Sequence, residues 1–146
     1  MEIAFKAVST IIMKNIYKHI LWWFAFPFVG ILNGVLREAT YKKFVGDLPA
    51  HQISTATGVI FFGIIFHFIF RKWKIESVKN AILIGVIWLC LTILFEFGFG
   101  HYIMGNSWQK LLHDYNLAKG RVWGLFLVWI TIAPFIFYKF FNKPKS

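Results

Sequence analysis

The sequence predicts an all-α integral membrane protein, with four transmembrane helices packed as a bundle in one membrane domain that covers residues 1–146. Of its residues 58% are hydrophobic and only 15% are charged, which leaves too little polar surface for a soluble domain of this size. Four stretches are almost free of charge and reach the roughly 20 residues that a helix needs to cross a bilayer. Their apolar residues do not alternate with polar ones, as the strands of a membrane barrel would require.

The N-terminal segment, residues 1–16, is predicted to form an interfacial helix. Its polar residues recur at helical spacing, with apolar residues elsewhere on the wheel: Glu2, Lys6, Ser9, Thr10 and Lys14. A helix with this distribution lies in the plane of the membrane surface, where its lysines contact anionic lipids. We therefore expect membrane lipids to be partners of the chain.

The four spans are expected at about 17–36, 48–70, 81–101 and 122–141. Pro27 is expected to kink the first span, because proline lacks a backbone donor. Asp47 is expected to be the N-cap of the second span, with Pro49 in its first turn. The 18 Phe and 7 Trp residues are expected on lipid-facing surfaces and in belts near the span ends.

The loop between the third and fourth spans, roughly 102–120, is predicted to contain a short amphipathic helix on the outer surface. Ser107 is suited to cap its N-terminus, and Gly120 is suited to its C-terminal stop. One face of this helix would be apolar and would cover the mouth of the bundle: Trp108, Leu111, Leu112 and Tyr115.

The charges in the loops predict the orientation of the bundle. The side that holds both termini and the loop between spans two and three carries ten of the sixteen basic residues and two of the six acidic ones. Basic residues in short loops stay in the cytoplasm, so both termini are expected there, in a multi-pass protein of the inner (plasma) membrane. Because much of the net charge of +10 follows this topological bias, nucleic-acid binding is not expected.

Polar and small residues within the spans follow helical spacing and gather toward the outer end. The four stripes are Gly30, Asn33, Gly34 and Arg37; His51, Ser54, Thr55 and Gly58; Gly85, Trp88, Thr92, Glu96 and Gly100; and Arg121, Gly124, Val128 and Thr131. Because lipid offers no hydrogen bonds, these stripes should turn inward. They predict a polar pocket, or alternatively a helix-packing seam, built from Asn33, Arg37, His51, Thr55, Thr92, Glu96 and Arg121.

Glu96 is the most informative single residue. It lies about five residues below the end of its span, hence roughly 7 Å inside the membrane at the 1.5 Å rise of a helix. A carboxylate at that depth is costly unless it is paired or protonated. Arg121 is the expected partner, in preference to Arg37, in a buried ion pair that locks the bundle. The alternative is a titratable or ligand-contacting carboxylate.

Metal, cofactor and catalytic chemistry receive little support. Cys90 stands alone in the chain, so neither a disulfide nor a thiolate cluster can form within it. Outer-side groups that could ligate a metal have no helix-borne metal-site spacing: His51, His101, His113 and Asp114. No nucleophile or nucleotide-binding motif is present. We therefore expect no cofactor, and favour a protein that is not an enzyme.

The function that the sequence favours is binding of a small polar or anionic group, or a lipid headgroup, in the outward-facing pocket. Such a site could serve transport, which with four spans would require a homodimer, and Gly30 and Gly34 form a candidate seam for it. One alternative is a structural or accessory subunit of a larger membrane complex. A second alternative is a metal-dependent membrane enzyme that uses the outer-side histidines with Glu96 or Asp114.

Overall fold

The computed structural model describes residue 3 and residues 16–142, and in this part of the chain it contains helices and no strand. Four helices are long and apolar enough to cross a membrane: Ile16–Val45, Asp47–Lys72, Val78–Ile103 and Trp123–Phe141. The predicted all-α bundle with four spans is therefore confirmed. The interfacial helix predicted for residues 1–16 lies almost wholly outside the described residues.

The first span is broken near its middle. Residues 16–23 are helical, Phe24 and Ala25 form a turn, and α2 (Phe26–Leu36) follows with Pro27 in its first turn. Proline has no N–H to donate to the preceding turn, which accounts for the predicted kink. Beyond Leu36 the helix continues through a π-helical turn, η1 (Arg37–Tyr41), into α3 (Lys42–Val45). The span is therefore longer than the predicted 17–36.

The second span is α4 (Asp47–Lys72), and Gly46 with φ of 85° makes the sharp turn before it. The prediction that Asp47 caps this helix is wrong. Gly46 occupies the cap position without a side-chain hydrogen bond, and Asp47 is the first helical residue. Its carboxylate instead lies 3.2 Å from Lys42 Nζ and forms an ion pair with Arg121.

The third span, α5 (Val78–Gly98), is capped by Ser77 and continues through a π-helical turn, η2 (Phe99–Ile103). In the following loop Ser107 caps α6 (Trp108–His113) by accepting a hydrogen bond from Lys110 N at 3.2 Å, as predicted. Gly120 ends not α6 but a separate 3-10 turn, η3 (Leu117–Lys119), in the left-handed conformation. The fourth span is α7 (Trp123–Phe141).

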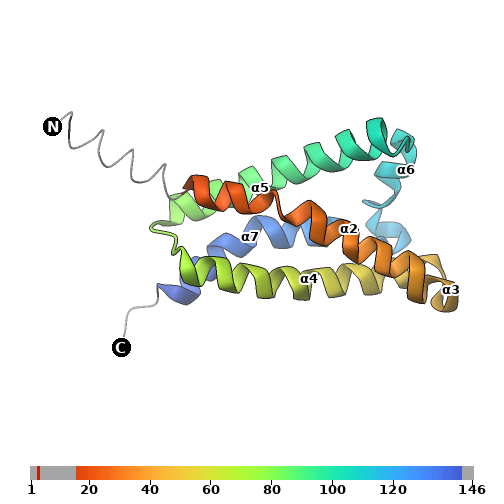
Figure 1. Cartoon of the computed structure of the whole chain (residues 1–146), viewed down its shortest axis with the longest axis horizontal. Coiled ribbons are helices and arrows are strands. Elements are labelled where there is room, and N and C mark those ends of the chain that lie inside the picture. The colour runs from red at the N-terminus through yellow and green to blue at the C-terminus, as the bar shows by residue number, and fades with distance from the viewer. Residues whose placement is uncertain (1–2, 4–15, 143–146) are drawn as a thin grey trace.

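The helices are arranged around α7, which packs along both α5 and α4, while α2 packs on α4 (Figure 1). The loop at 73–77 and both ends of the continuous segment 16–142 lie at one end of the bundle. The short helices α3 and α6 lie at the other, which we call the α6 end. Near the 73–77 loop, His19 Nε2 lies 3.0 Å from Trp73 O, and its own carbonyl accepts from Trp88 Nε1 at 3.0 Å.

The centre of the bundle is aromatic. Phe26, Phe62, Phe66, Phe70 and Trp88 are all at most 5% exposed. Their rings contact one another mostly edge-on or tilted, for example Phe26 on Trp88 with centroids 4.8 Å apart. The expectation that the Phe and Trp residues serve only lipid contact and interfacial belts is therefore wrong, because several of them form the core that holds the spans together.

The helices α5 and α7 approach each other closely at Gly85. A methyl group at Gly85 would lie 2.0 Å from the backbone oxygen of Thr131, so only glycine permits this crossing. The side chains of α5 that follow Gly85 at helical spacing, Trp88, Thr92 and Glu96, consequently face the interior. The predicted inward direction of this third stripe is confirmed.

Candidate functional site

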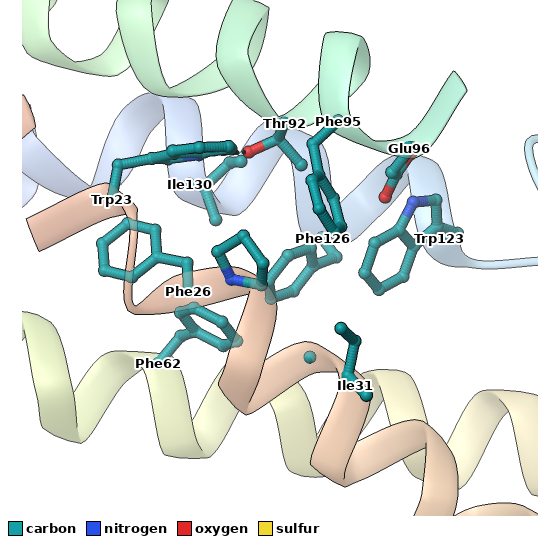
Figure 2. A pocket seen from close by; sticks show the side chains of 12 residues that line it. Trp23, Phe26, Ile31, Phe62, Thr92, Phe95, Glu96, Trp123, Phe126 and Ile130 are labelled. Carbon is teal, nitrogen blue, oxygen red and sulfur yellow. Dashed lines mark hydrogen bonds between the residues drawn. The ribbon is translucent and has the colours of Figure 1, made fainter. Parts of the chain in front are cut away.

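Two adjoining cavities occupy the α6-end half of the bundle. The larger, of about 360 Å³, lies between α2, α4, η2 and the segment 106–126, and we call it the polar cavity. The smaller, of about 190 Å³, reaches toward the aromatic core, and we call it the apolar cavity (Figure 2). They share seven lining residues: Gly30, Ile31, Phe62, Phe95, Glu96, Trp123 and Phe126. The two cavities therefore adjoin along a shared wall, with most of the polar groups toward the α6 end and apolar ones toward the core.

Glu96 stands where the two cavities meet (Figure 2). Its carboxylate accepts a hydrogen bond from the Tyr115 hydroxyl, and the indole nitrogen of Trp123 lies beside it (Figure 2). Across residues 16–142, no Lys, Arg or His side chain lies within ion-pairing distance of this carboxylate. The predicted ion pair with Arg121 is therefore wrong, and the partners of Glu96 are neutral.

Both candidate arginines are engaged elsewhere. Arg121 forms an ion pair with Asp47 and lies 3.6 Å from an oxygen of Asp114, outside the wall of either cavity. Arg37 lines the polar cavity, but its Nε lies 3.2 Å from Oε1 of Glu38. The guanidinium groups thus have carboxylate partners at the rim of the bundle, where water reaches both groups.

Asn33 joins α2 to α4. Its Nδ2 donates to the carbonyl of Ser54 at 2.7 Å, and its Oδ1 accepts from the Thr57 hydroxyl at 3.2 Å. Asn33 and Ser54 also line the polar cavity. The packing-seam interpretation therefore describes Asn33 well, since both ends of its amide are used in the contact between the two helices.

The polar residues of α4 are buried, as the second stripe predicted. His51 is 5% exposed and lines the polar cavity, and its Nε2 has no hydrogen-bonding partner among residues 16–142. Thr55 is equally buried, but its hydroxyl donates to the carbonyl of His51 at 2.9 Å and lines neither cavity. His51 is therefore a residue of this wall with a polar atom that lacks a partner.

Thr92 lies deeper in the bundle, on the wall of the apolar cavity. Its hydroxyl accepts a hydrogen bond from Trp23 Nε1 at 3.0 Å (Figure 2). This bond joins residues 16–23 of the first span to α5, so Thr92 has a clear structural role as well as its position beside the cavity.

The glycines of the first stripe form part of the polar cavity wall. Methyl groups at Gly30 and Gly34 would meet no atom within 4 Å, so in the monomer these glycines keep space open rather than admit a neighbouring helix. The fourth stripe is wrong in part. Val128 is 54% exposed, and Gly124 has open space where a close helix contact was expected.

Two polar residues of the cavity were not predicted as site residues, Asn106 and Tyr115, and Asp114 was named only as a candidate metal ligand. The sequence placed Tyr115 on the apolar face of the loop helix. In the structure Tyr115 follows α6, and the path of the chain there brings its hydroxyl to Glu96. Burial raises the pKa of the Tyr115 phenol far above its ordinary value, and the Glu96 carboxylate raises it further. The phenol is therefore a lasting hydrogen-bond donor.

The candidate metal ligands are not brought together. His51 is in the cavity, whereas His101 stacks on Trp108 at 3.9 Å and hydrogen-bonds the Asn106 carbonyl. His113 lies beside Asp114 at the surface. No group of three or more His, Cys, Asp or Glu side chains within 16–142 is placed to hold a metal ion.

The fold defines a multi-pass α-helical membrane protein, and the structure contains cavities between its spans. Comparisons of the chain with protein-family models, with curated proteins and with solved structures gave no match. What the site does must therefore be argued from its own chemistry.

Proposed function

We propose that the adjoining cavities bind an amphiphile taken from the membrane. Its polar group would lie in the polar cavity, and its apolar part would lie in the apolar cavity. The observation that carries this proposal is the wall that the two cavities share, which consists of Glu96 and six further residues. A single ligand with a polar and an apolar end matches such a pair of cavities better than a small polar solute, which would leave the apolar cavity unfilled.

The exposure of two lining residues supports access both from the membrane and from the water at the α6 end. Ile31 lines both cavities and is 44% exposed on the lipid-facing side of α2. Met104, at the α6 end of the polar cavity, is 63% exposed. An amphiphile could therefore enter sideways beside Ile31, with its polar group leading toward the water at Met104.

The polar contacts available to such a ligand are specific. His51 Nε2 lacks a partner, and the Glu96 carboxylate has lone pairs beyond the one used by Tyr115. A buried polar atom without a partner costs free energy, so a ligand that supplies a hydrogen bond to His51 gains affinity. As part of this proposal the α6 end faces outward from the inner membrane, with both termini cytoplasmic, because the loop charges favour that orientation.

A cavity-filling substitution tests the proposal. Gly30→Leu places four carbon atoms in open space where the two cavities meet. Gly98→Leu is the matched control, because Gly98 is also an open helical glycine but lines neither cavity. We expect the native chain and Gly98→Leu, purified in a mild detergent, to be stabilised against heat by added decanol, and Gly30→Leu not to be.

The responses of Gly30→Leu and Gly98→Leu to decanol decide whether the cavities are the binding site. Gly30→Leu should itself fold, since its Cβ would meet no atom within 4 Å, so a lost response would reflect a filled site. If Gly30→Leu responds to the amphiphile as strongly as Gly98→Leu does, the cavities are not the binding site. Native chains that respond to no amphiphile would refute the proposal as well.

A further inference from the structure

The charge of Glu96 has no counterpart in its surroundings. The carboxylate lies in the last turn of α5, where the Tyr115 hydroxyl donates to it and the indole nitrogen of Trp123 lies beside it. An uncompensated carboxylate inside a membrane costs several kcal/mol, which neutral donors reduce but do not remove. Two species can neutralise it: a proton on the carboxyl group, or a cationic group of a ligand.

The other charged and titratable groups around the cavities do not supply a positive charge. From η1, Arg37 is paired with Glu38, and the loop after α6 adds Asp114, a second carboxylate. From α4, His51 faces the cavity as a ring whose Nε2 has no partner. Tyr115, from the same loop, is a neutral donor because its pKa is raised. Among the residues that line the two cavities, the Arg37 guanidinium is already paired, so the anionic ligand that the sequence favoured has no unpaired guanidinium or ammonium group to bind.

The rings beside Glu96 favour a cation as well. Phe95, Trp123 and Phe126 line both cavities around the carboxylate (Figure 2). The faces of aromatic rings attract positive charge, and the attraction is strongest for tryptophan and in a desolvated site. An alkylammonium group can contact the carboxylate and the rings together, whereas a phosphate or sulfate would be repelled by the charge of the carboxylate and by the negative faces of the rings.

We propose that the polar group bound at Glu96 is an ammonium, and that the ligand is therefore a lipophilic organic cation that exchanges with a proton. This inference rests on the proposed function and names its ligand class. When the cation binds, the proton on the carboxyl group leaves to water through the polar cavity, so that one positive charge replaces another. The exchange keeps the site neutral overall and explains why Glu96 has no fixed partner.

Amphiphiles with one tail and different head charges test the inference. Decyltrimethylammonium, decanol and decanesulfonate would each be titrated into the full chain in a mild non-ionic detergent, with binding measured by calorimetry. We expect the cation to bind about tenfold or more tighter than decanol, since an ion pair in a low-dielectric site is strong. We expect decanesulfonate to bind weakest. Tighter binding of decanesulfonate would overturn the inference.

Proton exchange gives an independent readout that needs no variant. In a weakly buffered solution, about one proton should be released for each cation bound, and none for decanol. The affinity for the cation should rise with pH by about tenfold per pH unit while the carboxyl group is protonated, because the proton competes for the same site. Binding of the cation without proton release at any pH would overturn the exchange.

Two substitutions locate the charge. Glu96→Gln keeps an acceptor for Tyr115 but removes the charge, so it should lower cation affinity by about tenfold or more and leave decanol binding intact. Glu76→Gln, at an exposed carboxylate that lines neither cavity, is the matched control and should keep proton release. Cation binding that survives Glu96→Gln or is lost in Glu76→Gln would overturn the assignment to Glu96. Equal binding of all three probes would refute only the inference that the ligand is a cation, whereas no binding of any probe would refute the proposed function.

Competition distinguishes the source of the ammonium. Dioctanoyl phosphatidylethanolamine and dioctanoyl phosphatidylglycerol would compete with decyltrimethylammonium for the native chain. Displacement by the ethanolamine lipid alone supports a membrane aminolipid as the ligand. No displacement by either lipid, with the cation bound and a proton released, supports a free lipophilic amine. Displacement by the glycerol lipid alone would overturn the inference, because that headgroup carries no cation.

Discussion

Substitution of Gly85 by alanine tests the crossing that positions Glu96. The added methyl carbon would lie 2.0 Å from the carbonyl oxygen of Thr131 and 3.0 Å from its carbonyl carbon. These are backbone atoms of α7, so no side chain can turn aside, and the two helices must separate by roughly 1 Å or more to reach ordinary contact distance. Overpacking costs about 1–3 kcal/mol, and the upper part of that range applies to a backbone clash.

The better helix propensity of alanine offsets about 1 kcal/mol of this cost. We therefore expect Gly85→Ala to lower the free energy of unfolding by about 2 kcal/mol, measured by circular dichroism in mixed micelles with increasing dodecyl sulfate. Gly98→Ala, in the same helix but with open space at its Cβ, is the control and should be neutral or slightly stabilising. Equal stability of the two variants would show that α5 and α7 do not cross at Gly85.

Four further outcomes are expected. Glu96→Gln should change the unfolding free energy by less than about 1 kcal/mol, whereas Glu96→Leu should lower it by about 1–3 kcal/mol because buried donors lose their acceptor. Chemical unfolding of both variants measures the difference. Asn33→Ala should cost about 1 kcal/mol by loss of the bonds between α2 and α4, in the same unfolding assay. Arg121→Ala should cost at most about 1 kcal/mol, and less in high salt, because its main partner Asp47 is 56% exposed; melting at two salt concentrations checks this. In an ultraviolet titration, one tyrosine should remain unionised well above pH ~10, and this late-titrating signal should be absent from Tyr115→Phe. Because the folded pKa of Tyr115 is raised, its contribution to stability is complete below the unfolded pKa and is lost as pH rises toward the folded pKa.

Much of the fold could be predicted from the sequence because hydropathy and charge act over whole segments. Four apolar stretches give four spans whatever their packing. Pro27 indicated the break in the first span, and Ser107 indicated the cap of α6. The π-helical extensions at η1 and η2 could not be predicted, since no local residue preference distinguishes them from ordinary helix.

The partners of the charged residues were harder to predict. Glu96 and Tyr115 are separated by 19 positions, and the path of the loop between them decides their contact. Spacing within one helix says which residues share a face, but not which residue of another segment meets them. Arg121 was expected at Glu96 because both lie near span ends. It instead contacts Asp47, whose carboxylate is not used to cap α4 because Gly46 takes the cap position.

The break at Phe24 and Ala25 gives the two halves of the first span separate attachments. The half before the break is fixed to α5 by the bond from Trp23 to Thr92, whereas the half after it is tied to α4 through Asn33. If an amphiphile passes beside Ile31 as proposed, only the part of the span after the break has to give way, because the two parts are held by different helices. Pro27 removes one hydrogen bond from this junction, since its nitrogen has no hydrogen to donate to the preceding turn, and leaves the bonds from Phe24 N to Leu21 O and from Ala25 N to Trp22 O.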